Sequence, residues 1–301
     1  MQRAIVLLAS TLLLSAVVLF GTGELLSRPA GRVIGEAPAA LRAISVRLPT
    51  SPTESVSGWF ARGAGSGAIL LLHGVRADRT HMLDRARFLR AEGYSVLLID
   101  LPAHGESSGE RITFGANEAA GVAAALRYLR AELPGERIGV VGVSLGAASL
   151  VLSRPTPAPS AVVLESMYPT IAAAVENRLV MRLGPVGGLA APLLLWQLPL
   201  RSGISSEQLR PLMALPELRA PILVASRTHD EHTTWPETER IFAAAHQPKE
   251  LWAVDGAAHV DLYSYDPAAY RARILRFFSQ HLRDASQAKS HQAVKTTAQS
   301  S

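Results

Sequence analysis

A serine at position 144 stands at the centre of Gly142–Gly146, so that a glycine lies two residues away on each side of it. The apolar residues 137–141 before this pentapeptide are typical of a buried strand, and residues 147–153 after it are typical of a helix. In a tight turn between the two, side chains at the glycine positions would collide. The hydroxyl would project beside the helix N-terminus, where N–H groups stabilise negative charge. The pattern predicts a nucleophile at Ser144, against the alternative of an ordinary glycine-rich turn.

Serine is a weak nucleophile at neutral pH and needs a general base, for which we predict His259. This histidine follows the last expected strand, 250–254, on a loop of small residues, and the last expected helix begins after it. An imidazole there could take the hydroxyl proton and pass it to the leaving group. Three other histidines compete but do not lie between that strand and that helix: His229, His232 and His246.

A carboxylate that orients the imidazole is expected after the preceding strand, 221–225, and we predict Asp230 for this role. Glu165 is the rival, because it ends an earlier strand beside the nucleophile strand. Asp255 and Asp261 flank the histidine and are expected to stabilise the local loop structure.

Two backbone N–H groups are predicted to form an oxyanion hole, those of Val75 and Leu145. Val75 belongs to the turn that ends the strand 68–72, and Leu145 follows the serine. His73 in the same turn is expected to brace the loop by hydrogen bonds. The polar loop 100–109, which contains His104, is expected to form scaffold around the site.

The elements that must position these residues alternate between short apolar strands and amphipathic helices. The expected strands are 68–72, 95–100, 137–141, 161–165, 221–225 and 250–254, and the expected helices are 79–91, 117–132, 147–153, 235–245 and 266–282. Repeated strand–helix units with apolar strands imply a mostly parallel sheet covered on both faces, which is an α/β fold. Ligands of such sheets bind beyond the carboxyl ends of the strands.

Five features occur in this order along the chain: Leu72-His73-Gly74, Asp100 to Gly109, Gly142 to Gly146, Asp230 and His259. Together they make residues 41–283 resemble the α/β-hydrolase superfamily. The chain looks most similar to the membrane-anchored, serine aminopeptidase-like or monoacylglycerol-lipase-like branch. The resemblance implies a central, mostly parallel sheet flanked by helices, a Ser-Asp-His triad, and no cofactor or metal ion. Two departures stand out: Ser226-Arg227 replaces the usual His-Gly pair, and Pro102-Ala103 replaces an Arg-Gly or Pro-Gly pair.

The N-terminal residues 1–26 are expected to form a signal anchor, a single transmembrane helix. Apolar residues run from Ala4 to Phe20, and Gly21 to Gly23 extend them to the roughly 20 residues that span a bilayer. A cleaved signal peptide is the alternative. Arg3 favours a cytoplasmic N-terminus and an extracytoplasmic catalytic part, although Arg28 and Arg32 on the other flank oppose that orientation.

The remaining segments are expected to be a linker at 27–40, one catalytic domain at 41–283, and a disordered tail at 284–301. Within the domain, the apolar segment 171–205 is expected to form a short cap over the carboxyl ends of the strands, and it suits an acyl or alkyl substrate. A helix pair that only packs on the body is the alternative. The cap could also touch lipid, because the anchor is near.

Composition excludes several classes of protein. The 301 residues are 48% hydrophobic and 18% charged, which excludes a disordered chain, and the absence of cysteine excludes disulfides and thiolate chemistry. The net charge is +5, but arginines such as Arg85, Arg127 and Arg137 are scattered and form no stripe, so no nucleic-acid partner is expected.

The predicted function is a serine hydrolase that cleaves carboxylic esters or related acyl bonds through an acyl-enzyme. Two alternatives remain at this stage. One is an aminopeptidase-like hydrolase, in which Glu165 or Glu231 would hold a free amine. The other is a membrane-tethered binding protein without activity, because a fold alone does not establish a reaction.

Overall fold

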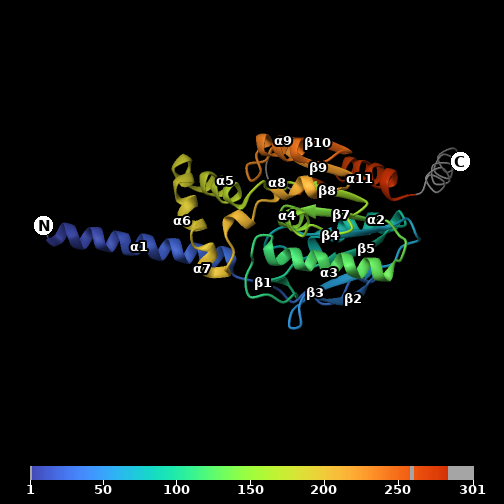
Figure 1. The fold of residues 1–301 in the computed structure, drawn as a ribbon, viewed down its shortest axis with the longest axis horizontal. Helices are drawn as coiled ribbons and strands as arrows, with labels where there is room; N and C mark the ends of the chain where they lie inside the picture. The colour runs from blue at the N-terminus through green and yellow to red at the C-terminus, as the bar shows by residue number, and fades with distance from the viewer. Residues whose placement is uncertain (1, 258–260, 284–301) are drawn as a thin grey trace.

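A sheet with the strand order β10-β9-β8-β7-β4-β5-β3-β2 forms the centre of the molecule (Figure 1). The structure is a computed structural model, and it describes residues 2–257 and 261–283. The strands are β2 (Ile44–Pro49), β3 (Ser55–Ala61), β4 (Ala68–Leu72), β5 (Ser95–Ile99), β7 (Ile138–Val143), β8 (Ala161–Glu165), β9 (Ile222–His229) and β10 (Lys249–Ala257). The pairs from β5 to β10 are parallel, whereas β3 is antiparallel to both β5 and β2.

Both faces of the sheet are buried, as the continuous apolar strands predict. In β4, Leu70 and Leu72 point into one core, and Ile69 and Leu71 point into the other. This division follows from the two-residue period of a strand. The helices around the sheet are α2 (Leu83–Ala91), α3 (Ala116–Glu132), α4 (Leu145–Leu152), α8 (Pro211–Ala214), α9 (Trp235–Ala244), α10 (Leu262–Tyr265) and α11 (Pro267–Leu282).

Two strands that were not expected from the sequence, β2 and β3, form the antiparallel edge of the sheet. Serine and glycine interrupt the apolar pattern of β3, so its strand character comes from pairing with β5. Gly58 is the clearest case, because a Cβ there would lie 2.5 Å from the carbonyl oxygen of Leu98. A second difference concerns the helix expected from residue 79, whose first turn is the 3-10 helix η2 (Arg79–Met82).

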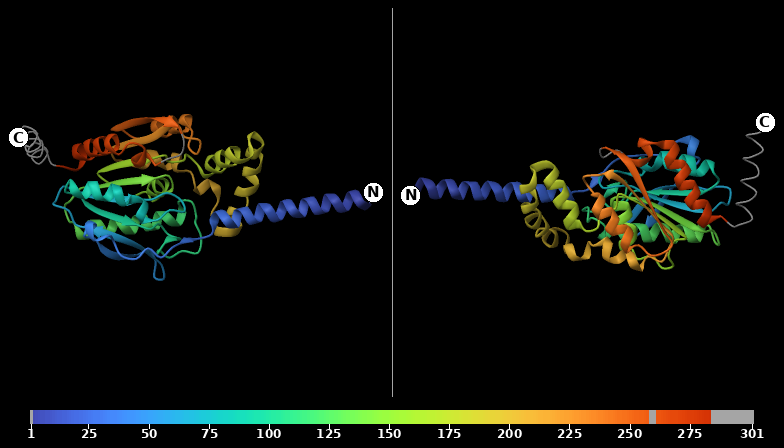
Figure 2. Two further views of the ribbon diagram at one scale, coloured as in Figure 1. Left: turned by 180° about the vertical axis from the view of Figure 1, so that it is seen from behind. Right: turned by 90° about the horizontal axis from the view of Figure 1, so that it is seen from above.

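The cap segment lies after β8 and forms a group of short helices at one end of the molecule (Figure 2). It consists of α5 (Ile171–Leu183), the 3-10 helix η3 (Pro185–Ala190), α6 (Ala191–Leu195) and α7 (Leu198–Ser202). Prolines at or near the starts of η3, α6 and α7 divide the segment into these pieces.

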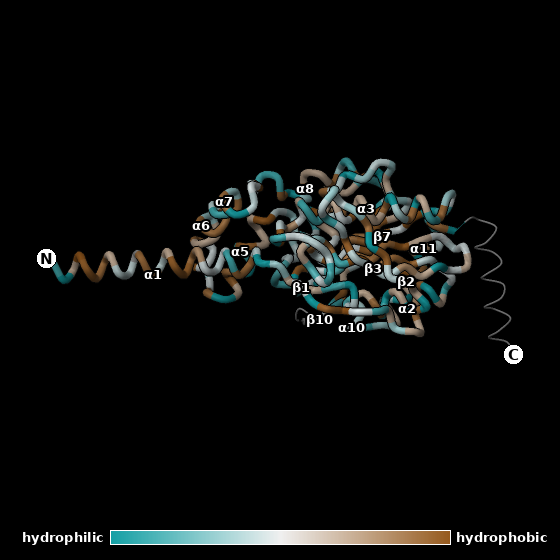
Figure 3. Tube along the Cα trace, turned by 90° about the horizontal axis from the view of Figure 1, so that it is seen from below, coloured by the Kyte–Doolittle hydropathy of each residue, from teal (hydrophilic) through white to brown (hydrophobic). Residues whose placement is uncertain are grey.

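The first helix, α1 (Gln2–Ser27), projects from the end of the molecule that carries the cap (Figures 1 and 3). It is 26 residues long, and its most apolar stretch of 18 residues has a mean hydropathy of 2.5 and is not buried against the protein. By length and composition it could cross a membrane, and a signal sequence at an N-terminus would pass the same test.

The segment 27–40, which we expected to be a linker, is hydrogen-bonded to the body. Residues Ala30–Gly31 form β1, which pairs in parallel with β6 (His104–Gly105). The carboxylate of Glu106 accepts hydrogen bonds from the N–H groups of Ile34 and Gly35, each at 2.9 Å. The tail expected at 284–301 lies outside the described residues.

Candidate active site

Ser144 occupies the turn between β7 and α4, in the strand–turn–helix context expected for it. Its backbone has φ 49° and ψ −106°, a strained conformation for a residue with a side chain. The N–H of Ser144 donates to the carbonyl oxygen of Glu165 at 2.8 Å, which holds the turn against β8. Ser144 as a whole is partly exposed to solvent.

The two glycines of the turn are required by space. A Cβ on Gly146 would lie 2.6 Å from the carbonyl oxygen of Leu72 and 2.8 Å from that of His73. A Cβ on Gly142 would lie 2.6 Å from the backbone nitrogen of Ala147. The collision within the turn that the spacing predicts therefore holds for Gly142, whereas Gly146 is required by the close approach of the end of β4.

The turn after β4 lies beside Ser144, because a Cβ on Gly74 would be 3.8 Å from the Cβ of Ser144. Leu145 is the first residue of α4, where backbone N–H groups have no carbonyl partner within the helix. The turn after β4 and the start of α4 therefore both lie beside the serine, and they carry the predicted donors Val75 and Leu145. Backbone N–H groups that point at a reacting carbonyl can stabilise a negative oxygen.

His73 is fully buried and braces this turn by hydrogen bonds. Its Nε2 accepts a hydrogen bond from the N–H of Leu101 at 3.0 Å, so its Nδ1 carries the proton and donates to the carbonyl oxygen of Gly74 at 2.7 Å. Burial, and the nearby ring of His104, lower the pKa of His73 to about 3. The ring is therefore neutral at pH 7 and joins the ends of β4 and β5.

Asp230 is buried and follows the carboxyl end of β9, as Ser144 follows the carboxyl end of β7. Its Oδ1 accepts from the N–H groups of His232 and Thr233 at 2.8 and 3.2 Å. These bonds fix the carboxylate within a turn. His259, the predicted base, lies outside the described residues.

The rival carboxylate, Glu165, is 1% exposed and belongs to a buried polar cluster. Its Oε2 accepts from Arg85 Nη2 at 2.7 Å, and its Oε1 accepts from the hydroxyl of Tyr270. Arg85 also pairs with Asp261, with 2.6 Å between Nη2 and Oδ1. Burial raises the pKa of Glu165, although the cation of Arg85 opposes this. Both oxygens of Glu165 are thus engaged on the side of the sheet covered by α2 and α11.

A second buried cation was also missed by the sequence analysis. Arg79 pairs with Asp100 and Glu106, and its guanidinium lies 4.6 Å from the ring of Trp59. Hydrogen bonds from Arg79 and from residues 34 and 35 lower the pKa of Glu106 to about 2. This cluster shapes the loop 100–109. The only sequence signal for Arg79 and Arg85 was their place on an otherwise apolar helix face.

Arg227 departs from the family pattern and lies near Asp230. Its side chain is 3% exposed, and within the described part of the chain its Nε and Nη1 have no hydrogen-bond partner. Burial lowers the pKa of Arg227, while the carboxylates of Asp230 and Asp261 raise it. The site therefore carries a buried cation beside the predicted acid.

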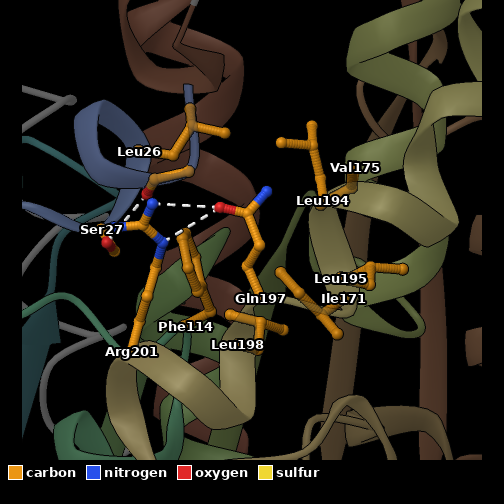
Figure 4. A pocket seen from close by; sticks show the side chains of 11 residues that line it. Leu26, Ser27, Phe114, Ile171, Val175, Leu194, Leu195, Gln197, Leu198 and Arg201 are labelled. Atoms are coloured by element: carbon orange, nitrogen blue, oxygen red, sulfur yellow. Dashed lines mark hydrogen bonds between the residues drawn. The ribbon is translucent and has the colours of Figure 1, made fainter. Parts of the chain in front are cut away.

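An apolar hollow lies between the cap and the end of α1 (Figure 4). Its polar edge contains Ser27, Gln197 and Arg201, and Gln197 accepts hydrogen bonds from Arg201. Ser144 and Asp230 do not line it. The apolar lining residues are Leu26, Phe114, Ile171, Val175, Leu194, Leu195 and Leu198.

Within residues 2–257 and 261–283, no group of three or more His, Asp or Glu side chains could hold a metal ion.

Comparisons with known proteins agree on the fold. The sequence pattern of the alpha/beta hydrolase family matches residues 69–273. The uncharacterized protein Rv2307c of Mycobacterium tuberculosis is 29% identical over 243 residues, which cover 78% of this chain and 79% of that protein. The uncharacterized protein YqkD of Bacillus subtilis is 23% identical over 217 residues, which cover 69% and 70% of the two chains.

Two esterase structures superpose on most of the chain. The Pyrococcus furiosus esterase Pf2001 gives a TM-score of 0.70 with 22% identity, covering 85% of this chain and 98% of the other. A thermophilic esterase from Thermogutta terrifontis gives 0.59 with 20% identity, covering 80% and 100%. At this identity the likeness establishes the fold, which confirms the predicted architecture.

Proposed function

The chain belongs to the alpha/beta hydrolase family, and from that premise we propose a serine hydrolase that cleaves carboxylic esters or related acyl bonds. The supporting observation is the strained turn at Ser144, with glycines at the two positions where a Cβ would clash. Such strain is retained where a reactive group must be presented. The match of esterase folds is consistent with this reaction class.

In the proposed reaction, the Ser144 hydroxyl oxygen attacks the substrate carbonyl carbon while His259 accepts the hydroxyl proton. Asp230 orients the imidazole and stabilises its charged form. The N–H groups of Val75 and Leu145 bind the oxyanion of the tetrahedral intermediate. The intermediate collapses to an acyl-enzyme, and His259 gives its proton to the leaving alcohol. Water then attacks the acyl-enzyme with the same base, which releases the acid and restores Ser144.

A fluorophosphonate probe tests the nucleophile directly, because it reacts with activated serines. Wild-type protein should be labelled, and Ser144→Ala should not be. The esterase activity of Ser144→Ala should be lower than that of wild type by on the order of 10⁴-fold or more. Ser149→Ala is the matched control, since Ser149 is a buried helical serine that bonds the carbonyl oxygen of Leu145. Equal labelling of wild type and Ser144→Ala would refute the assignment, and an unlabelled wild type would favour a binding protein.

The apolar cap segment favours substrates with an acyl or alkyl part. A panel of short-chain esters, monoacylglycerols and aminoacyl amides separates the substrate classes. We expect the esters to be hydrolysed. Preference for aminoacyl amides would support the aminopeptidase alternative instead, although Glu165, one of its two candidate amine ligands, is already bound by Arg85 and Tyr270.

For the N-terminal helix, the proposal is a retained membrane anchor with an extracytoplasmic catalytic part. Retention is supported by the last turns of α1, which bond to the body. Glu24 pairs with Arg111 and Arg201 at 2.9 and 2.6 Å, and the carbonyl oxygen of Ser27 accepts from the N–H of Ile112 at 2.8 Å. Cleavage near residues 21–27 would remove or expose these contacts.

A further inference from the structure

The charged residues of α1 mark how deep the helix can lie in a bilayer. Between Arg3 and Glu24, the chain has an uncharged run from Ala4 to Gly23. A helix rises about 1.5 Å per residue, so a run of about 20 residues spans about 30 Å, the thickness of the hydrocarbon core. Glu24 is therefore placed at the membrane boundary when the run crosses the bilayer.

The cap is bonded to α1 at this same level. Arg201 of α7 pairs with Glu24, with 2.6 Å between Nη1 and Oε2, and also donates to the carbonyl oxygen of Phe20. Gln197 donates from Nε2 to the carbonyl oxygen of Leu19 at 3.2 Å. A Cβ on Gly23 would lie 2.6 Å from the side-chain oxygen of Gln197, so glycine permits this close approach. The cap helices thus flank the last turn of the apolar run.

Large apolar side chains are exposed on the cap around this junction. They include Leu189 at 79% and Trp196 at 63% of their full exposure. Among the described residues outside α1 and the cap, only four large apolar side chains are exposed: Val33, Ile44, Met213 and Tyr265. A concentrated apolar surface marks an interaction site, and tryptophan is enriched at membrane boundaries. The cap surface consists of Leu183, Val186, Leu189, Leu193, Trp196 and Leu200.

We infer that this cap surface lies in the bilayer interface, where lipid headgroups meet the upper acyl chains, next to the point where α1 leaves the membrane. The polar contacts of Arg201 and Gln197 hold it at that depth. Figure 1 shows α5, α6 and α7 at the end of the body from which α1 projects, which is the arrangement the inference requires. It depends on the proposed anchor and not on the chemistry of Ser144.

The absence of cysteine makes a direct test possible, because single cysteines can be labelled in the full chain. The fluorophore NBD is attached at Leu189→Cys or Trp196→Cys, and the protein is inserted into vesicles of phosphatidylcholine and phosphatidylglycerol. Quenching by lipids with a nitroxide on the upper acyl chain is then measured. Ser10→Cys in the apolar run and Gln280→Cys at the opposite end of the body are the reference positions; both side chains are exposed.

Quenching at 189 and 196 should approach that at 10 and exceed that at 280 by about fivefold. Labels at 189 and 196 that behave like the label at 280, while position 10 is quenched, would overturn the inference alone. An unquenched label at 10 would overturn the anchor and the inference together. Fluorophosphonate labelling in the same vesicles reports separately on Ser144, so failure of the proposed hydrolase activity remains distinguishable.

Discussion

At the scale of single residues, the two carboxylates that compete for the role of acid have different surroundings. Glu165 is bound through both oxygens to Arg85 and Tyr270. Asp230 is bound through Oδ1 to two backbone N–H groups of its own turn. A carboxylate held by a buried arginine stabilises structure, whereas one fixed by a turn at the sheet edge can orient a histidine. These contacts favour Asp230 as the acid.

We expect Asp230→Asn to lower kcat by on the order of 10⁴-fold, because an amide cannot stabilise the charged imidazole. The amide oxygen can still accept the two backbone hydrogen bonds, but the buried Arg227 loses a nearby negative charge, so we expect a modest loss of thermal stability. Ester hydrolysis and thermal unfolding of the purified variant measure the two effects.

Glu165→Gln should show the reverse pattern. It leaves the buried Arg85 with Asp261 as its remaining charged partner, which should lower the free energy of unfolding by about 3 kcal/mol. The kcat of the folded fraction should remain near wild type. A silent Asp230→Asn together with a Glu165→Gln variant that folds but is inactive would assign the acid to Glu165.

At the scale of elements, the residues of the candidate site follow the carboxyl ends of four parallel strands. Ser144 follows β7, Gly74 follows β4, Leu101 follows β5 and Asp230 follows β9. The buried ring of His73 joins two of these ends by hydrogen bonds to Gly74 and Leu101. The turn that carries the predicted oxyanion donor Val75 therefore depends on a neutral histidine.

This dependence predicts a loss of stability in mild acid. The pKa of His73 falls from 6.5 to about 3 on folding. Below pH 6.5 the unfolded chain binds a proton that the folded protein does not, so stability falls as pH decreases toward 3. Between pH 7 and pH 5 this residue should reduce the free energy of unfolding by ~2 kcal/mol.

The measurement is denaturant unfolding of the full chain in detergent micelles at the two pH values. His73→Gln should lose about 2 kcal/mol of the pH dependence, since its side chain does not titrate. His246→Gln is the control, because His246 is exposed. An unchanged pH dependence in His73→Gln would show that the ring is not held neutral.

At the scale of the whole molecule, α1 and the body form one structure rather than a domain on a tether. The guanidinium of Arg76 donates to the carbonyl oxygens of Leu25 and Arg28 at the end of α1. Residues 30 and 31 then add a strand to β6. If α1 is the proposed anchor, a helix fixed in this way sets the orientation of the cap and of the central sheet relative to the membrane.

A retained anchor predicts the mass of the mature protein. Protein isolated from the membrane fraction after expression should have an intact mass that includes residues 2–27. Resistance to extraction by alkaline carbonate should accompany it, because a spanning helix is not released by changes in pH or salt. A mass that corresponds to cleavage between residues 20 and 28, with recovery in the soluble fraction, would establish a signal peptide instead.

The order of strands and helices, and the turn at Ser144, could be predicted from the sequence because they depend on local patterns. Apolar runs such as 68–72 bury both faces of a strand whatever their neighbours are. The need for glycine at position 142 follows from a collision within the turn, because a Cβ there would lie 2.6 Å from the backbone nitrogen of Ala147. The collision at Gly146 is instead with the end of β4, so the reason for that glycine appears only in the tertiary structure.

Tertiary structure alone decided the features that depend on partners far away in the chain. β3 is a strand because β5 lies beside it, and residues 27–40 are ordered because Glu106 and β6 bind them. Arg85 was one scattered cation among others until folding brought Glu165, 80 positions away, to its side. Burial of a charge depends on finding its partner in space, and no local pattern specifies that partner.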